Sequence, residues 1–218
     1  MPFFCFQNSV IEDYKVLKKS IVVEKTALKA KYESANTIAD KKAILDETRK
    51  VFTNCVVQKI VPSWMGTKWS FYGHTEIPLQ GDVACGYFVS TTLNHGGLNI
   101  NRYKLAQKSP ENEALTIALS SKVESFENWD SATLKNHFLT NKKDGLYFVG
   151  LDFHVGYLFK QGNEVFFIHS NYIKSQGVTK ELIENSTAII SKKYFIAEIT
   201  YNEELIKKWL LNGVVKTN

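Results

Sequence analysis

The chain has 218 residues, of which 44% are hydrophobic, and this is enough apolar material for one sizeable core. The net charge of +5 comes from lysine and arginine residues interleaved with acidic ones, a pattern typical of solvated helix surface, so no nucleic-acid partner is predicted. The cysteines, Cys5, Cys55 and Cys85, include no CxxC pair, which argues against a disulfide framework or a zinc knuckle. No apolar run is long enough to predict a transmembrane segment.

The opening MPFFCFQNS bears on localisation. It lacks the basic region and the long apolar region of an intact signal peptide. Two interpretations stay open: the remnant of a removed export signal in a periplasmic or lipid-anchored bacterial protein, with Cys5 near the lipid-attachment position, or the frayed end of a cytoplasmic one. The sequence decides neither the compartment nor the oligomeric state.

Two amphipathic helices are predicted in an N-terminal helical segment, residues 1–62. Apolar residues recur at helical spacing over residues 11–32 and again over residues 38–60. Pro62 is expected to end the second helix, because the residue before a proline is disfavoured in helical conformation. Cys55 lies on the apolar stripe and is interpreted as a core thiol.

The remainder, residues 63–218, is expected to form a second unit that packs with the helices as one compact body. Residues 63–82 have no clean period and predict an ordered loop, and a helix should follow, with Asp82 as its N-cap and Gly96 and Gly97 as its stop. Further short helices and then β-rich runs indicate an α+β fold. The expected strands are LYFVGLD, FHVGYLF, EVFFIHSNY and KYFIAEIT, with EELIKKWLL as a closing helix.

Cys85 is the candidate nucleophile, because it falls in the first turn of a predicted helix. Unpaired N–H groups and the helix dipole at that position favour the thiolate, which is the reactive form. Gly81 and Gly86 nearby would let a substrate approach the backbone, and the Cys85 N–H could stabilise an oxyanion.

His154 is the candidate base, and the strand pattern supplies a partner for it. If FHVGYLFK and NEVFFIHS form a hairpin around Gln161 and Gly162, His154 faces His169 directly across the ladder. His169 would then fix the tautomer of His154, as the third member of a catalytic triad does. Asn171, two residues along on the same face, is the rival orienting residue.

These residues together resemble the NlpC-like branch of the papain-like cysteine peptidases and amidases. The resemblance covers residues 69–172 and depends on GDVACGYFV at a helix start followed by HVGYL and FIHSNY on adjacent strands. It implies a papain-like fold in which Cys85 is the nucleophile, His154 the base and His169 the third residue. It also implies that Tyr72 lines the site and assists the oxyanion, with Trp69 beside the substrate path. Ala84 and Gly86 stand where the family has Asp or Asn and Ser.

Two other site interpretations are possible for the remaining polar residues, and the sequence supports them less well. His74 with Cys85, His154, His169 and Asp152 could in principle hold zinc, although no metal-ligand spacing supports this. Arg102 in NRYKLAQ could hold a substrate carboxylate, with solvated surface as the simpler interpretation. No metal and no organic cofactor is therefore expected.

The function expected from the sequence is a cysteine hydrolase that cleaves an amide bond through a thioester. The resemblance places short bacterial cell-wall peptides first among substrates, with peptidoglycan fragments as the partner. A deamidase or acyltransferase would use the same nucleophile. The competing class is a non-catalytic peptide- or glycan-binding module on the same fold, in which Cys85 is unreactive.

Overall fold

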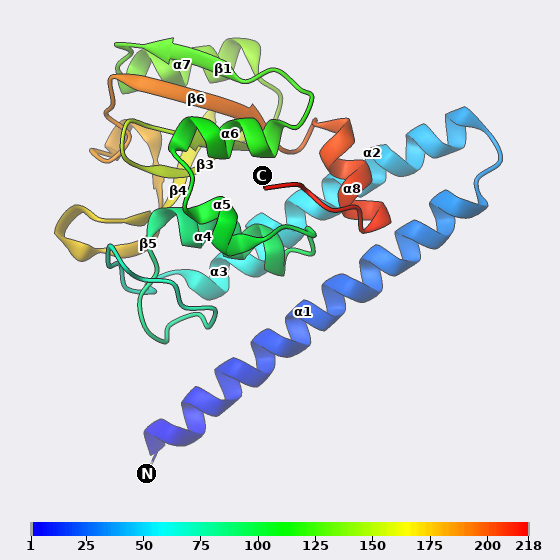
Figure 1. Cartoon of the computed structure of the whole chain (residues 1–218), viewed down its shortest axis with the longest axis horizontal. Coiled ribbons are helices and arrows are strands. Elements are labelled where there is room, and N and C mark those ends of the chain that lie inside the picture. The colour runs from blue at the N-terminus through cyan, green and yellow to red at the C-terminus, as the bar shows by residue number, and fades with distance from the viewer. Residues whose placement is uncertain (1, 218) are drawn as a thin grey trace.

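The first two helices form an antiparallel hairpin that lies along the rest of the molecule (Figure 1). The computed structural model describes the backbone of residues 2–217 and the side chains of residues 11–217, so the interpretation of the Cys5 side chain lies outside the described residues. Helix α1 (Pro2–Ser34) buries Tyr14, Ile21 and Leu28, which are seven residues apart and form a narrow apolar seam. Helix α2 (Ile38–Asn54) begins at Thr37, whose hydroxyl accepts from the Asp40 N–H at 3.0 Å.

Pro62 does not end the second helix, and the prediction on this point was wrong. Helix α2 continues as a π-helix, η1 (Cys55–Ile60), and then as α3 (Val61–Trp64), with Pro62 in the first turn of α3. Pro62 has no N–H to donate, and the helix passes through it directly after a π-helical turn, in which the Val61 N–H donates to the Val56 carbonyl five residues back. Cys55 is fully buried, as predicted, and burial raises the pKa of its thiol to about 11.

The second part of the chain is an α+β body built on a six-stranded antiparallel sheet, in the order β1-β6-β2-β3-β4-β5. The four strands expected from the sequence are present, and they are the four central ones. The two outermost strands, β1 and β5, were missed because their sequences, ESFE and GVTKEL, contain few apolar residues. The strands are β1 (Glu124–Glu127), β2 (Gly145–Gly150), β3 (Val155–Gln161), β4 (Glu164–Asn171), β5 (Gly177–Leu182) and β6 (Lys193–Glu198).

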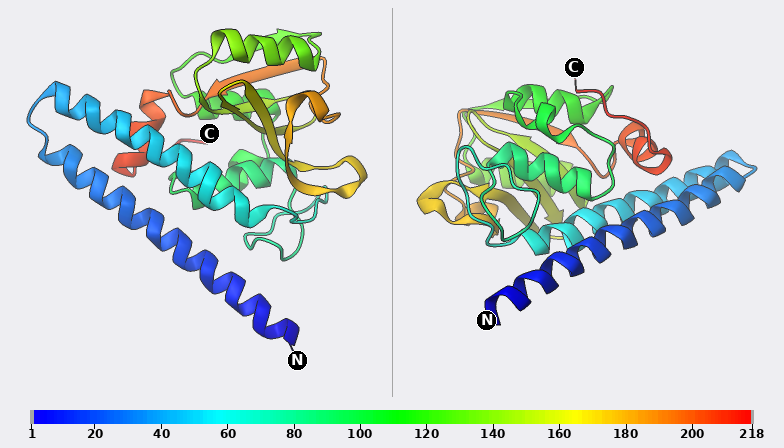
Figure 2. Two further views of the ribbon diagram at one scale, coloured as in Figure 1. Left: turned by 180° about the vertical axis from the view of Figure 1, so that it is seen from behind. Right: turned by 60° about the horizontal axis from the view of Figure 1, so that its bottom comes forward.

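Helices cover both faces of the sheet, so the sheet separates two apolar clusters (Figure 2). The larger cluster joins the sheet to the helical hairpin, α4, α6 and α8, and includes residues from both ends of the chain. The smaller one lies under α7. The remaining helices are α4 (Cys85–His95), α5 (Arg102–Ala106), α6 (Pro110–Ala118), α7 (Ser131–Asn141) and α8 (Glu203–Leu211), with 3-10 turns η2 (Ile173–Ser175) and η3 (Ile183–Asn185). Over residues 2–217, no helix has both the length and the apolar character needed to cross a membrane.

A buried series of side-chain hydrogen bonds connects α1 to the rest of the protein. The Trp64 indole N–H donates to the Tyr14 hydroxyl at 2.8 Å, and that hydroxyl lies 2.9 Å from Nδ1 of His95 at the end of α4. Burial lowers the pKa of His95 to about 3, with Lys18 and Arg102 adding to the effect. The ring therefore stays neutral in the folded protein at pH values where it is protonated in the unfolded chain.

The neutral His95 predicts that the fold loses stability as the pH falls below about 6.5, the pKa of an unfolded histidine. In this range the unfolded state binds a proton that the folded state excludes. The variant His95→Gln should therefore show a smaller decline in the free energy of unfolding, by up to about 1.4 kcal/mol for each pH unit. Urea unfolding of both proteins at several pH values between 7 and 5 measures the difference. Equal declines in the two proteins would contradict the prediction.

Candidate active site

Cys85 is the first residue of α4, and Ala84 takes the N-cap position that Asp82 was expected to hold. The correction has a local cause. Asp82 pairs with Lys68 and Val83 pairs with His74 through backbone bridges, so both residues are extended. The Ala84 N–H then donates to the Gly73 carbonyl at 2.8 Å, and the helix begins only after it.

The segment before Cys85 is fastened to the sheet. The Ser170 hydroxyl on β4 donates to the Val83 carbonyl at 2.7 Å, and the Val83 N–H donates to the Lys68 carbonyl at 2.9 Å. Both Val83 and Ser170 are buried. The start of α4 is therefore held against the same strand that carries His169.

The Cys85 thiol is partly buried and lies against the backbone that joins His154 to β3. The backbone N–H groups of Val155, Gly86 and Cys85 favour the anion of this thiol. Within the described residues, no hydrogen bond runs directly from the sulfur to the ring of His154. Catalytic contacts are often longer than a hydrogen bond before substrate binds.

Burial decides the protonation of this thiol. The sequence predicted a lowered pKa from the helix start, but loss of solvent outweighs the backbone N–H donors and raises the pKa of Cys85 to about 11. Burial also lowers the pKa of His154 well below its usual range, with His169 as a second cause. Both shifts favour a neutral thiol beside a neutral imidazole over a thiolate–imidazolium pair.

The hairpin that carries both histidines is paired differently from the prediction. Gln161 faces Glu164, so the two-residue loop is Gly162 and Asn163. Gly162 has a φ of 58°, which suits the first loop position of a type II′ turn, and this turn sets the register. His169 is consequently diagonal to His154 rather than opposite it. It lies across from Gly156, where an added Cβ would come within 2.9 Å of the Cβ of His169.

The two imidazoles are nevertheless hydrogen-bonded to each other, and His169 is also hydrogen-bonded to a carboxylate. Nε2 of His154 lies 2.8 Å from Nδ1 of His169, and Nε2 of His169 lies 3.0 Å from Oε1 of Glu181 on β5. His154 is 4% exposed and His169 is fully buried. The hydrogen bond from His169 holds the pKa of Glu181 below its usual value, so this carboxyl is an ionised acceptor.

The order of donors along this series of hydrogen bonds fixes the tautomers of both histidines. An ionised carboxylate only accepts, so His169 must carry its proton on Nε2, and Nδ1 of a neutral ring must then accept. His154 must therefore carry its proton on Nε2, which leaves the lone pair on its Nδ1. That nitrogen is the one available to accept a proton.

Glu181 is the residue of this site that the sequence interpretation missed, and the Asn171 amide has partners other than the histidines. The Asn171 amide donates to Gln176 at 2.8 Å and accepts from the Ile173 N–H at 2.8 Å, so it holds the β4–β5 loop. Finding Glu181 would have required recognising GVTKEL as a strand that pairs with FIHSN.

Of the two aromatic candidates, Trp69 is connected to the histidines and Tyr72 is not. The ring of Trp69 lies 6.2 Å from that of Tyr172, and Tyr172 lies 5.0 Å from the ring of His154. Tyr72 is 84% exposed, and its aromatic contact is with Phe71. Its loop reaches the site through the neighbouring Gly73, whose carbonyl caps the start of α4.

Arg102 is a structural cross-link, which corrects both interpretations offered for it. The guanidinium is buried and donates to Glu76 at 2.8 Å, to the Thr91 hydroxyl at 2.7 Å and to the His74 carbonyl at 2.7 Å. It thus ties the loop over residues 66–84 to α4. His74 itself contacts the Tyr72 carbonyl through Nδ1. Among the described residues, no group of three or more His, Cys, Asp or Glu side chains is arranged to hold a metal ion.

The hydrogen-bonded relay from Glu181 through His169 to His154 predicts that both imidazole rings are held as the Nε2–H tautomer at neutral pH. In Glu181→Leu the His169 N–H loses its acceptor, so each ring should become a mixture of tautomers. Nitrogen-15 NMR of the imidazoles measures this directly. Glu164→Leu, an exposed change on the strand of His169, is the control and should keep the wild-type signals. Unchanged signals in Glu181→Leu would show that Glu181 does not orient the pair.

No protein-family model, curated protein or solved structure matches this chain. The resemblance to the NlpC-like branch therefore depends on the chain's own residues. Those residues are Cys85 at a helix start, His154 directly before β3 and His169 on β4. Membership of that family is not shown by any comparison.

Proposed function

We propose that this protein is a cysteine hydrolase of the NlpC-like, papain-like type, and that it cleaves an amide bond through a thioester. The observation that carries the proposal is the relay from Glu181 through His169 to His154. His154 directly precedes Val155, whose backbone N–H favours the anion of the Cys85 thiol. A buried base with a defined tautomer beside a thiol is the arrangement that covalent thiol catalysis needs.

In the proposed reaction Nδ1 of His154 takes the proton of Cys85 as the sulfur attacks the carbonyl carbon. The backbone N–H of Cys85, in the first turn of α4, donates to the oxyanion. His154 then gives its proton to the leaving amine, and a thioester remains on Cys85. Water, deprotonated by the same imidazole, releases the acid and restores the thiol.

The resting site is proposed to be neutral, which distinguishes it from a preformed thiolate–imidazolium pair. Proton transfer then accompanies attack, and the charge that develops on His154 is stabilised through His169 by the Glu181 carboxylate. Short bacterial cell-wall peptides stand first among the proposed substrates by resemblance. The aromatic line of Trp69 and Tyr172 beside His154 would form one wall of the substrate path.

A non-catalytic peptide- or glycan-binding module is the second candidate. The raised pKa of Cys85 favours it, because a thiol protonated at neutral pH is a weak nucleophile unless a base acts on it. In that case the buried relay would serve only to satisfy polar groups in the core. A deamidase or acyltransferase remains within the first proposal, since each passes through the same thioester and differs in what accepts the acyl group.

Trapping of the acyl-enzyme tests the proposal. Incubation with cell-wall muropeptides and with a panel of acyl amides and activated esters should add one acyl group to Cys85, detected by mass spectrometry of the intact protein and its peptides. Cys85→Ala should lose the adduct and all turnover, whereas Cys55→Ala, which changes the other buried thiol, should keep both. If a substrate binds without forming an adduct, and its affinity is the same in Cys85→Ala, the hydrolase proposal is wrong and the binding module is favoured.

Alkylation tests the neutral resting state separately. With a pKa of about 11, Cys85 should react with iodoacetamide more slowly than free cysteine at pH 7, and the rate should rise with pH up to about 11. His154→Gln should change this rate little, because the resting thiol forms no ion pair with the ring. Cys5→Ser and Cys55→Ala in the background isolate the signal. Fast labelling at pH 6 that is lost in His154→Gln would establish an ion pair instead.

A further inference from the structure

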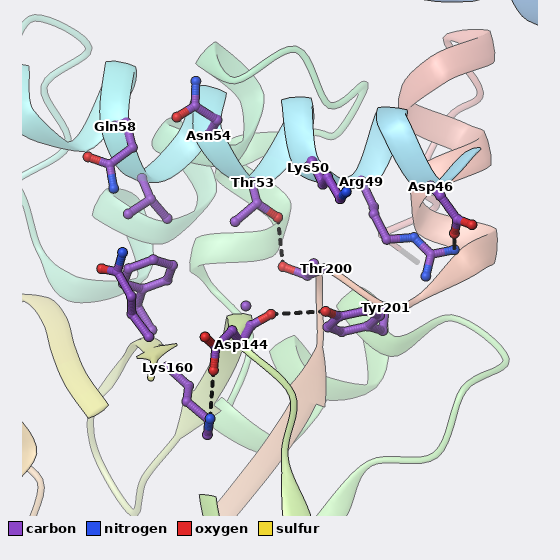
Figure 3. A pocket seen from close by; sticks show the side chains of 14 residues that line it. Asp46, Arg49, Lys50, Thr53, Asn54, Gln58, Asp144, Lys160, Thr200 and Tyr201 are labelled. Carbon is purple, nitrogen blue, oxygen red and sulfur yellow. Dashed lines mark hydrogen bonds and ion pairs between the residues drawn. The ribbon is translucent and has the colours of Figure 1, made fainter. Parts of the chain in front are cut away.

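A concave site lies at the far end of the sheet from Cys85. It is a cleft of about 530 Å³ between the helix α2–η1 and the ends of β2, β3 and β6 (Figure 3). This volume falls within the range of roughly 300–1,000 Å³ that small-molecule sites occupy. Because β3 runs seven residues from the His154 end to the cleft, at about 3.3 Å per residue, the two sites are about 20 Å apart.

The roof of the cleft is a polar stripe on a helix. Its members recur every three or four residues, while α2 buries Leu45, Thr48 and Phe52. Figure 3 shows Thr53 pointing toward Thr200 across the cleft, whereas Asn54 points away from it. A polar helix face normally meets bulk solvent. Here Lys50, Asn54 and Gln58 are exposed, whereas Asp46, Arg49 and Thr53 are half-buried at the edge of the cleft. The π-helix that extends α2 is a feature often found at functional sites. The stripe consists of Asp46, Arg49, Lys50, Thr53, Asn54 and Gln58.

Arg49 provides a charged group with unused hydrogen-bonding capacity. Its Nη2 pairs with Asp46 at 2.8 Å, and its guanidinium lies 5.4 Å from the centre of the Tyr201 ring, which limits its movement. Its Nε is buried and has no partner among the described residues. A buried N–H without an acceptor is unfavourable, and the guanidinium fork matches the two oxygens of a carboxylate or phosphate.

The charges of the cleft leave a net positive site. Asp46 is paired with Arg49, and Asp144 is paired with the buried Lys160 at 2.6 Å, so both carboxylates are neutralised. Lys50 adds a positive charge for which the described residues supply no ion pair. An anion is therefore the favoured ligand.

The floor of the cleft adds an apolar surface with two hydroxyls. The hydroxyls of Thr53 and Thr200 lie 2.7 Å apart and bridge the helix to the sheet, with Val57 and Phe159 beside them. Val57 and Phe159 are largely covered by the protein, at 4% and 7% exposed, and their exposed parts form this floor. A ligand with an anionic end and a flat or aliphatic body would cover it.

We propose that this cleft binds a small organic anion, with its carboxylate or phosphate on Arg49 and its apolar body over Val57 and Phe159. The proposal is independent of the chemistry at Cys85. Binding there would bridge α2 to the ends of β2 and β3, and so would hold the helical hairpin against the sheet.

The chain offers a sharp test because Arg49 and Arg102 are its two arginines. Nitrogen-15 NMR of the full-length protein should show two arginine Nε–H signals. The signal that is absent from the Arg49→Gln spectrum is the one from Arg49. Benzoate and phenyl phosphate should shift the Arg49 signal with saturation, while the Arg102 signal stays still as an internal reference. Benzyl alcohol, which lacks the charge, should shift neither, and inorganic phosphate should bind more weakly than phenyl phosphate.

Variants separate the site from general charge effects. Arg49→Lys keeps the charge and loses the fork, and should weaken benzoate binding about tenfold or more, followed through backbone signals of Thr53 and Thr200. Lys192→Gln, a distant change of one positive charge, is the control and should bind as the wild type does. The proposal is overturned if neither anion saturates the Arg49 signal, if chloride at equal ionic strength gives the same shift, or if Arg49→Lys binds equally well.

Discussion

The candidate site depends on the burial of two adjacent imidazoles. A buried ring nitrogen without a hydrogen bond carries a desolvation cost, and two neutral rings can satisfy one another only if a fixed acceptor orders their protons. Glu181 supplies that acceptor at the far end, 3.0 Å from His169. The polarity of the whole chain of hydrogen bonds, and so the lone pair on Nδ1 of His154, follows from one carboxylate on an outer strand.

Burial has a second consequence, which acts on the thiol. The loss of solvent that orders the histidines also raises the pKa of Cys85 and lowers that of His154, so charge separation between them is disfavoured at rest. A helix start favours a thiolate, but here the N–H groups of the first turn compensate only part of the desolvation. In the proposed reaction the charge appears when substrate arrives, where the same N–H groups and the relay can stabilise it.

Several contacts outside the relay fix the positions of Cys85 and the histidines relative to one another. Ser170 ties the segment before Cys85 to β4, and Arg102 ties the preceding loop to α4. Gly156 leaves room for His169 to reach His154 diagonally. The helical hairpin contributes to the main core through Tyr14, Ile21 and Leu28, and with the sheet it encloses the cleft around Arg49. The candidate active site and the cleft thus lie toward opposite ends of β3.

The sequence by itself determined the helices, the four central strands and the candidate nucleophile and base, because their apolar periods and the cysteine at a helix start are local signals. It could not determine Glu181, because the outer strand β5 has too few apolar residues to show a strand pattern, and its neighbour is fixed only by strand pairing. The Gly162 turn shifted the hairpin register, yet His154 and His169 stayed on one face because the shift kept the two-residue period of a strand. The protonation of Cys85 and the cleft at Arg49 were decided only by tertiary structure, because desolvation and enclosure depend on residues far apart in the chain.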